Sequence, residues 1–275
     1  DLIGESPYAP SSGITTFRGN NASTQTLGYD LTLSTKNIQG QFAWFTTFLI
    51  SGLKEEVTRY ESEVSINNLI NYSMAGRGGE YYPIEGRPLF GVYSLEWAGL
   101  NPENGNPMGM LDGQPSEEYR ELINSADLES IIYHGPARPT SFGAIRNDFA
   151  WKGFSLSVNI SYRFGYYFRR ASVQYDPILL GRGGHSDYTL RWRNPGDELT
   201  TQIPSMPSAR NSFRDQFYRN NSSLVEKGDH IRLQDIRLGY QVGKSRGFLS
   251  GVRNAELFLY ANNLGMIWKA TERGL

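Results

Sequence analysis

The sequence contains no cysteine, which excludes disulfide bonds, zinc–thiolate sites and thiol-based catalysis. Its formal net charge is −1, so no excess of positive charge points to nucleic acid as the main partner. No run approaches the roughly 18 apolar residues that a membrane-spanning helix requires. This composition excludes a helical membrane protein but is compatible with a β-barrel, whose strands alternate apolar and polar side chains.

Histidines are few, and no phosphate-binding or nucleophile pattern is visible. His134, His185 and His230 are not spaced as metal ligands on one element, so we expect them in exposed loops. The glycine-rich stretches at residues 76–79 and 181–184 do not join a strand to a helix and match no phosphate-binding fingerprint, so we interpret them as flexible loops. No serine lies in a Gly-x-Ser-x-Gly elbow.

Carboxylate pairs are present, but their spacing does not suit catalysis. Glu55-Glu56 and Glu117-Glu118 are neighbours in the sequence and cannot face each other across a cleft as a glycosidase pair does. We expect all four in solvent. The prediction is therefore that the protein is not an enzyme and has no catalytic, cofactor-binding or metal-binding residue.

What the chain does have is a long alternating segment at residues 154–164. One face would carry Phe154, Leu156, Val158, Ile160, Tyr162 and Phe164, and the other would carry Ser155, Ser157, Asn159, Ser161 and Arg163. A period of two predicts a strand, because successive side chains point to opposite sides of a sheet. The tight Lys152-Gly153 turn joins it to residues 145–151 as a hairpin.

Two environments could produce this alternation. A soluble sandwich buries the apolar face, whereas a membrane barrel turns it to lipid and keeps the polar face wet. The segment exceeds the roughly five or six residues of a typical soluble strand. Aromatic residues gather at both of its ends, as they do at membrane interfaces. The pattern predicts an all-β, antiparallel protein and leaves both environments open.

Further strands are predicted over residues 26–35, 41–54, 89–99, 232–242 and 254–262. A bulge is expected near Gln234-Asp235, where the alternation changes phase. On residues 41–54 both faces carry apolar side chains, so the side that meets water is undetermined. Residues 1–24, 58–88, 100–144 and 169–230 are expected to be irregular. Short helices are predicted at residues 116–125, around Tyr188 and Trp192, and around Phe213 and Phe217.

Two features of the long loops leave alternatives open. If the short turns at 36–40 and 152–153 lie at one end of a barrel, an even number of strands must separate their hairpins. Only one strand, over residues 89–99, is predicted between them, so either a second strand lies near residues 131–134 or one turn lies at the other end.

The aromatic residues Tyr81, Tyr82, Trp97, Tyr188 and Trp192 could stack on a ligand, but we favour packing within the loops.

Three segments carry a resemblance to a known family. The first is residues 21–33, an asparagine at 21 followed by Thr-Leu-Gly-Tyr-Asp-Leu-Thr-Leu at 26–33. The second is residues 134–157, beginning His-Gly-Pro-Ala-Arg-Pro-Thr-Ser-Phe-Gly. The third is residues 225–240 (Val-Glu-Lys-Gly-Asp-His-Ile-Arg-Leu-Gln-Asp-Ile-Arg-Leu-Gly-Tyr), followed by 257–264 (Leu-Phe-Leu-Tyr-Ala-Asn-Asn-Leu). In order and spacing they resemble the C-terminal barrel of SusC/RagA-type TonB-dependent outer-membrane transporters.

The resemblance implies a plugged barrel of about 22 strands in the outer membrane of a Bacteroidetes-type bacterium. Such a protein imports oligosaccharides or peptides with a SusD-like surface lipoprotein and is driven by TonB–ExbB–ExbD. Residues 1–275 are expected to be the C-terminal portion of that barrel, without the plug and the final strand. The family has no catalytic residues to carry over, and no ligand-binding residue is assigned.

Two other functions remain possible at this point. One is a TonB-dependent receptor for metal chelates. The other is a soluble all-β carbohydrate-binding module, in which the apolar faces of residues 27–33 and 154–164 would pack against each other. As an isolated arc of a barrel, the chain is expected to aggregate in water because its strand edges and apolar face are uncovered.

Overall fold

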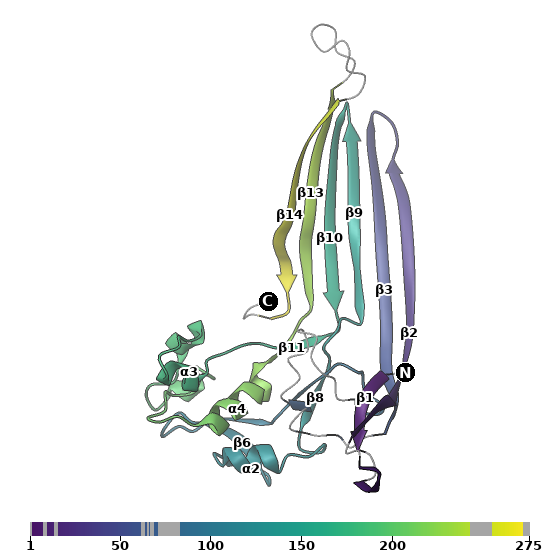
Figure 1. Cartoon of the computed structure of the whole chain (residues 1–275). Coiled ribbons are helices and arrows are strands. Elements are labelled where there is room, and N and C mark those ends of the chain that lie inside the picture. The colour runs from purple at the N-terminus through teal and green to yellow at the C-terminus, as the bar shows by residue number, and fades with distance from the viewer. Residues whose placement is uncertain are drawn as a thin grey trace. The chain divides into compact units, whose positions relative to one another are not determined.

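The computed structural model describes residues 2–7, 10–13, 16–61, 64, 66, 69–70, 83–242 and 255–271. The chain divides into two compact units, whose elements are labelled in Figure 1. The sheet unit comprises residues 26–54, 139–166 and 228–275, and the loop body comprises residues 1–25, 55–138 and 167–227. Each unit gathers segments that are far apart in the sequence, so both depend on non-local contacts.

The main sheet contains seven strands in the order β1-β2-β3-β9-β10-β13-β14. They are β1 (Leu2–Pro7), β2 (Thr16–Ile38), β3 (Phe42–Tyr60), β9 (Ser141–Trp151), β10 (Phe154–Phe164), β13 (His230–Val242) and β14 (Ala255–Lys269). The long strands lie side by side in Figure 1, and the recorded pairs are antiparallel. The predicted all-β, antiparallel fold is confirmed. In the described residues the sheet is open, with β1 and β14 at its edges.

The predicted hairpin of β9 and β10 is confirmed, with Trp151 opposite Phe154. Lys152 and Gly153 both have positive φ, at 47° and 89°. Two residues of this kind give the turn the twist that an antiparallel hairpin requires. On the other side of β9, Phe42 of β3 also pairs with Trp151. The short turn before β3 and the Lys152-Gly153 turn therefore lie at the same end of the sheet.

This pairing answers the question of strand parity. Strand β3 pairs directly with β9, so no described strand of the main sheet lies between the two hairpins. The number of intervening strands is therefore zero, which is even, as two turns at the same end of a barrel require. The single strand predicted over residues 89–99 is wrong. Two short strands, β4 (Gly91–Ser94) and β5 (Trp97–Leu100), occupy this region and belong to different small sheets. Consecutive residues from Val92 to Leu95 are buried, so both sides of the segment face protein.

The bulge predicted near Gln234-Asp235 is confirmed. Asn159 pairs with Asp235 and the next residue, Ile160, pairs with Leu233, so Gln234 has no partner in this register. The extra residue restores Leu233 to the apolar side of the sheet, which explains the change of phase in the sequence. The strands predicted over residues 26–35, 41–54 and 254–262 exist and are longer than expected.

The loop body holds the remaining elements. Its strands and helices, besides β1, β4 and β5, are η1 (Pro10–Ser12), β6 (Pro107–Leu111), β7 (Gln114–Ser116), α2 (Tyr119–Asn124), β8 (Ile132–Pro136), β11 (Tyr167–Arg169), α3 (Tyr175–Leu179), η2 (Ser186–Leu190), η3 (Asp197–Leu199), α4 (Ser212–Asn220), η4 (Ser222–Leu224) and β12 (Val225–Lys227). Two apolar clusters form its core. One centres on Phe217 and α2, and the other on Tyr175 and Tyr218. These buried clusters show a packed unit of structure rather than an extended loop.

The predictions for the irregular regions are partly wrong. Residues 2–7 form β1, which pairs with residues 16–22 of β2, so tertiary pairing overrides the weak local pattern. The expected loop at 100–144 contains β6, β7, α2 and β8. Two predicted helices are confirmed as α2 and α4, whereas the one around Tyr188 is the 3₁₀-helix η2, which ends before Trp192. The short helix α3 was not predicted.

Candidate functional site

One side of the main sheet is apolar across all its long strands, and the register shows which residues share it. Val158 lies opposite Asn147 of β9 and Ile236 of β13, and Leu156 lies opposite Phe149 and Leu238. The β3 residues that pair with this side of β9 are Phe42, Trp44, Thr46, Phe48 and Ile50. The ambiguity of residues 41–54 is thereby settled, because these five residues continue the apolar side of β10.

The apolar side of β2 points the same way. A Cβ added at Gly52 of β3 would meet the ring of Tyr29, and the Asn37 amide nitrogen donates to the Thr46 hydroxyl 2.7 Å away. Odd-numbered residues of β2 thus share the face of Thr46 and Val158. Residues 27–33 and 154–164 lie on one face of one sheet and cannot pack against each other. The soluble sandwich requires that packing, so this alternative is wrong.

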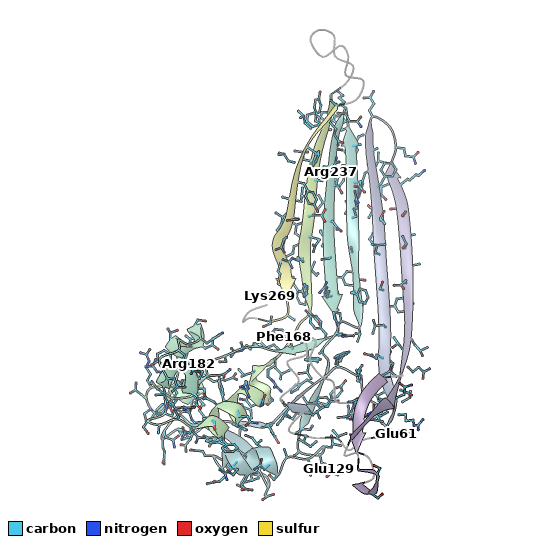
Figure 2. All side chains as sticks on the ribbon, in the orientation of Figure 1. Glu61, Glu129, Phe168, Arg182, Arg237 and Lys269 are labelled. Atoms are coloured by element: carbon cyan, nitrogen blue, oxygen red, sulfur yellow. The ribbon has the colours of Figure 1, made fainter. Side chains whose placement is uncertain are left out.

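The apolar face is exposed rather than buried. Leu27 is 65% exposed and Leu259 is 73% exposed, and most large side chains of this face on β2 and β14 are similar. Figure 2 shows side chains projecting from both sides of the strands. An uncovered apolar surface of this extent is rare on a soluble monomer and marks a surface that meets lipid or another protein.

Aromatic residues concentrate at the two ends of the apolar face. Near the turns, the rings of Phe42 and Trp44 stack on Phe149, and Phe154 contacts Tyr240. Near the other end, Phe164 contacts Tyr162 and Trp268. Ten residue steps separate Phe154 from Phe164, or about 34 Å along the strand. At a tilt of about 40° this gives about 26 Å, close to the apolar band of a membrane barrel.

A small polar group interrupts the apolar face. The Thr46 hydroxyl and the Trp44 indole N–H both donate to the Asn147 side-chain oxygen, at 2.8 and 2.9 Å. Thr46 is only 5% exposed because its neighbours cover it. These polar atoms bind one another, which lowers the cost of placing them in an apolar environment.

The opposite face is mainly polar. Asn159 donates to Asp235, and Arg237 forms an ion pair with Glu256 at 2.7 Å. Arg146 and Asp148 form a further pair on β9. Such groups suit contact with water, although this face also carries Phe45, Leu49 and Phe142. The sheet therefore has one apolar side and one side that is largely polar and charged.

The aromatic residues considered as ligand platforms are used for packing. Trp97 stacks on Phe217 and contacts Tyr218 between the two core clusters. The Trp192 indole is buried and donates to Glu198, and Tyr188 contacts Tyr175. The packing interpretation is confirmed for Trp97, Tyr188 and Trp192. Tyr81 and Tyr82 lie outside the described residues.

The histidines are less exposed than expected. His134 lies in β8 with Nε2 2.7 Å from the Ser94 hydroxyl, and burial together with the charge of Arg169 lowers its pKa. His230 is buried at the start of β13, so the exposed-loop prediction is wrong for both. His185 caps η2 by accepting from the Asp187 N–H. Across the part of the chain that the structure describes, no group of three potential metal ligands forms.

Glu117 is also not the solvated carboxylate that was expected. Its side chain accepts hydrogen bonds from the amide groups of Asn101, Asn104 and Asn106 at 2.6, 3.2 and 2.7 Å. Three donors of this kind hold the 101–106 loop against β7. The neighbouring Glu118 is exposed, as predicted. Residues 76–79 lie outside the described residues, and in the 181–184 stretch Gly181 and Gly183 have positive φ.

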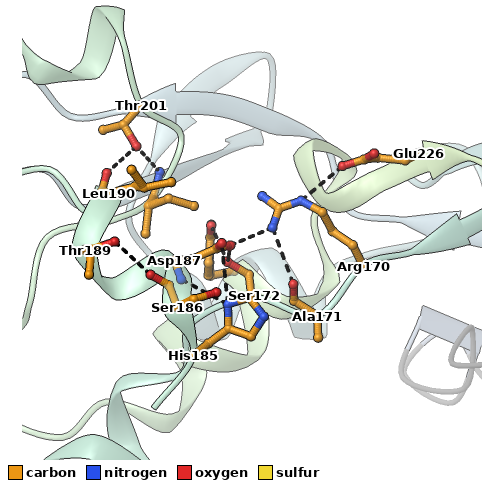
Figure 3. Close-up of polar contacts among 12 residues, drawn as sticks. Arg170, Ala171, Ser172, His185, Ser186, Asp187, Thr189, Leu190, Thr201 and Glu226 are labelled. Atoms are coloured by element: carbon orange, nitrogen blue, oxygen red, sulfur yellow. Dashed lines mark hydrogen bonds and ion pairs between the residues drawn. The ribbon is translucent and has the colours of Figure 1, made fainter. Parts of the chain in front are cut away.

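A charge cluster in the loop body surrounds the buried side chain of Arg170 (Figure 3). Arg170, whose side chain is 7% exposed, pairs with Asp187 at 2.6 Å and with Glu226 at 3.2 Å. Burial opposes ionisation of Asp187, but hydrogen bonds from Ser172 and Arg170 outweigh it and lower its pKa. The cluster joins the strand pair β11–β12 to η2. Its members come from three distant stretches of sequence, and no local pattern identified them.

The preceding residue, Arg169, has a different role. Its guanidinium donates to the Ile70 carbonyl, the Asn220 side chain and the Tyr93 carbonyl. Burial and the nearby Arg219 charge lower its pKa. An arginine remains protonated at neutral pH even so, because its ordinary value is far higher. Arg169 therefore fixes backbone of the loop body as a buried cation bound to neutral acceptors.

No family model matches the chain. Among curated proteins it is similar to TonB-dependent receptor P26 of Formosa agariphila, with 24% identity over 98% of this chain and 27% of the relative. TonB-dependent receptor P3 of the same organism is 24% identical over 96% of this chain and 26% of its own length. A solved structure of the RagAB peptide transporter covers 97% of this chain and 28% of its own, with a TM-score of 0.66 and 17% identity.

The chain is similar to part of a SusC/RagA-like TonB-dependent transporter. A solved structure of the RagAB peptide importer in the closed-closed state is also similar to this chain, with a TM-score of 0.65 and 18% identity over 98% of this chain. The chain spans about a quarter of the length of the curated relatives that it matches.

The helices that the structure describes belong to the loop body. Among the described residues, no helix is long and apolar enough to cross a membrane. Sequence reasoning identified the apolar alternation of the sheet but not the Arg170 cluster or the amide cluster around Glu117. Both join residues whose separation in sequence hides their contact.

Proposed function

We propose that this chain forms part of the barrel wall of a TonB-dependent transporter in the outer membrane. The observation that carries the proposal is the apolar face shared by β2, β3, β9, β10, β13 and β14. Its aromatic ends are separated by about the thickness of a bilayer core. Lipid is the environment in which an exposed apolar face of this height is stable.

In this proposal the barrel is completed by strands outside this chain. The edge strand β14 spans Ala255–Lys269 and presents apolar side chains on both faces. In lipid, every backbone N–H and C=O must find a partner, so an edge of this length must pair with another strand. The greater length of the similar receptors is consistent with such a completion.

The transporter would import nutrients such as oligosaccharides or peptides. It would act with a SusD-like surface lipoprotein and draw energy from the TonB system. The similarity to a RagAB peptide transporter supports peptides as one substrate class. No observation on the described residues favours a receptor for metal chelates.

The membrane assignment is tested by spin labels on Val158 and Asn159 in the full-length protein in lipid vesicles. These neighbours lie at the same depth on opposite faces of β10. We expect oxygen, which concentrates in lipid, to relax the label at residue 158, and a water-soluble nickel chelate to relax the label at 159. If the label at 158 is shielded from both reagents, the face is covered by protein and the proposal is wrong.

A further inference from the structure

A bulge in the small sheet of β4 and β8 determines where the His134 side chain lies. The two β8 residues that flank His134 pair with the adjacent Val92 and Tyr93 of β4, so His134 itself has no partner in this register. Its Nε2 atom lies 2.7 Å from the hydroxyl of Ser94, which is fully buried. Bulges recur where a strand must re-aim a side chain. This bulge directs a titratable ring against a buried hydroxyl group.

The charge that acts on the His134 ring is positive. Among the described residues this charge belongs to Arg169 of β11, and together with burial it lowers the His134 pKa. The Arg169 guanidinium itself donates to two backbone carbonyls and to the Asn220 side chain, all of which are neutral. The charge of Arg219 also acts on Arg169, with the same sign. A second cation at His134 is therefore opposed by like charge and by desolvation.

The other titratable groups around His134 do not supply a negative charge. The Tyr167 ring of β11 lies with its centroid 6.3 Å from that of His134. Beside the bulge, Tyr93 and Tyr133 contact each other, and Arg87 lies over the Tyr133 ring. Burial raises the pKa of both Tyr93 and Tyr133, so neither ionises in the range in which a histidine titrates. Protonation of His134 would thus add positive charge without a nearby carboxylate among the described residues.

Close packing limits how far the two cations could move apart. A Cβ added at Gly135 would lie 2.7 Å from the Tyr167 ring, so β8 packs directly on β11 (Figure 1). On β4, a Cβ added at Gly91 would lie 2.6 Å from the Tyr93 ring. Close-packed interiors relieve strain poorly by small shifts. Separation of the charges therefore requires that the contact between β4, β8 and β11 loosen.

We propose that His134 is a pH-responsive element of the loop body, whose protonation beside Arg169 loosens the contact between β4, β8 and β11. The inference goes beyond the proposed function and does not depend on it. The neutral imidazole is the form that the folded protein favours. The closed contact is therefore most stable above the ordinary histidine pKa of 6.5, and it loses stability as the pH falls from there through the lower pKa of the folded protein.

The test is hydrogen exchange of the full-length protein in lipid vesicles at pH 7 and pH 5, read by mass spectrometry and corrected for the intrinsic effect of pH on exchange. We expect the protection of residues 91–94 and 132–136 to fall several-fold at pH 5. The upper limit is about 25-fold, the ratio that follows from an ordinary histidine pKa in the open state. Amides of β10 and β13, in the main sheet, are the internal reference and should keep their protection.

Two variants assign the effect to one histidine. His134→Gln can still form a hydrogen bond with Ser94 but cannot be protonated, so the ratio of protection between the two pH values should return to one. His185→Gln, at the histidine that caps η2, is the matched control and should keep the wild-type ratio. Because the readout is a ratio, a uniform loss of stability in a variant does not affect it.

Two results would overturn the inference and leave the proposed function intact. One is equal protection of residues 91–94 and 132–136 at pH 7 and pH 5 in the wild-type protein. The other is a wild-type ratio in His134→Gln, which would assign the pH dependence to a different group. Failure of the full-length protein to insert into the vesicles would instead contradict the proposed function.

Discussion

A lysine placed on the apolar face provides a quantitative test of the membrane assignment. Val158 lies between Asn147 and Ile236, four residues after Phe154 and six before Phe164. It is therefore about 14 Å along a strand segment of about 34 Å, near the middle of the apolar band. Val158→Lys should cost about 2–4 kcal/mol of stability in lipid, the range found for a cation at the bilayer midplane.

The adjacent residue supplies the control. Asn159→Lys adds the same charge at the same depth on the polar face, where Asp235 is within hydrogen-bonding distance of the native side chain. A partly solvated ion pair changes stability by less than about 1 kcal/mol, so this variant should be nearly neutral. The contrast between neighbouring positions separates the effect of lipid from that of β propensity.

The assay is urea unfolding of the full-length protein in lipid vesicles, followed by tryptophan fluorescence. The free energy of unfolding should fall for Val158→Lys and stay near the wild-type value for Asn159→Lys. An equal loss of unfolding free energy in the two variants would refute the assignment of one face to lipid and the other to water. A larger loss for Asn159→Lys would place lipid on the side that carries Arg237 and Glu256.

Three further predictions concern packing and charge. Glu117→Ala removes the acceptor of three asparagine amides and should raise hydrogen exchange in residues 101–117, with a local loss of about 2–3 kcal/mol. Asp187→Asn should increase proteolysis of residues 180–199, because the buried Arg170 loses one of its two charged partners and keeps only Glu226. Gly143→Ala should destabilise the β3–β9 pair by about 2 kcal/mol or more, since the new methyl group would lie 2.0 Å from the Leu49 carbonyl oxygen.

Each of these predictions has its own control. Glu118→Ala, at the exposed neighbour, should leave exchange unchanged, and an equal effect would show that the amide cluster contributes nothing. Because the Asp187 pKa is lowered on folding, its contribution is present above the ordinary aspartate value and is lost only as pH falls through the lower folded value. Proteolysis of the wild type should therefore be the same at pH 7 and pH 5. The control for Gly143→Ala is Ser141→Ala on the same strand. If the two variants had the same heat stability, the predicted clash at residue 143 would be contradicted.

The sequence alone determined the nature of the main sheet. Alternation in residues 154–164 predicted β10, and the residue pair Lys152-Gly153 predicted the tight turn of the hairpin. The change of phase at Gln234 marked the bulge. These features are local, because side-chain period and turn geometry depend on residues that are adjacent in the chain. The resemblance to SusC/RagA-type transporters rested separately on the residues of three segments, which lie before residue 34, at 134–157 and at 225–264.

Only the tertiary structure decided which strands pair and which face each residue joins. The pairing of β3 with β9 brings together Thr46 and Asn147, about a hundred residues apart, and it settled both the strand parity and the apolar side of β3. The loop body likewise depends on contacts such as Arg170 with Glu226. Local periodicity cannot encode such partners, because each residue's burial and charge environment is set by segments distant in sequence.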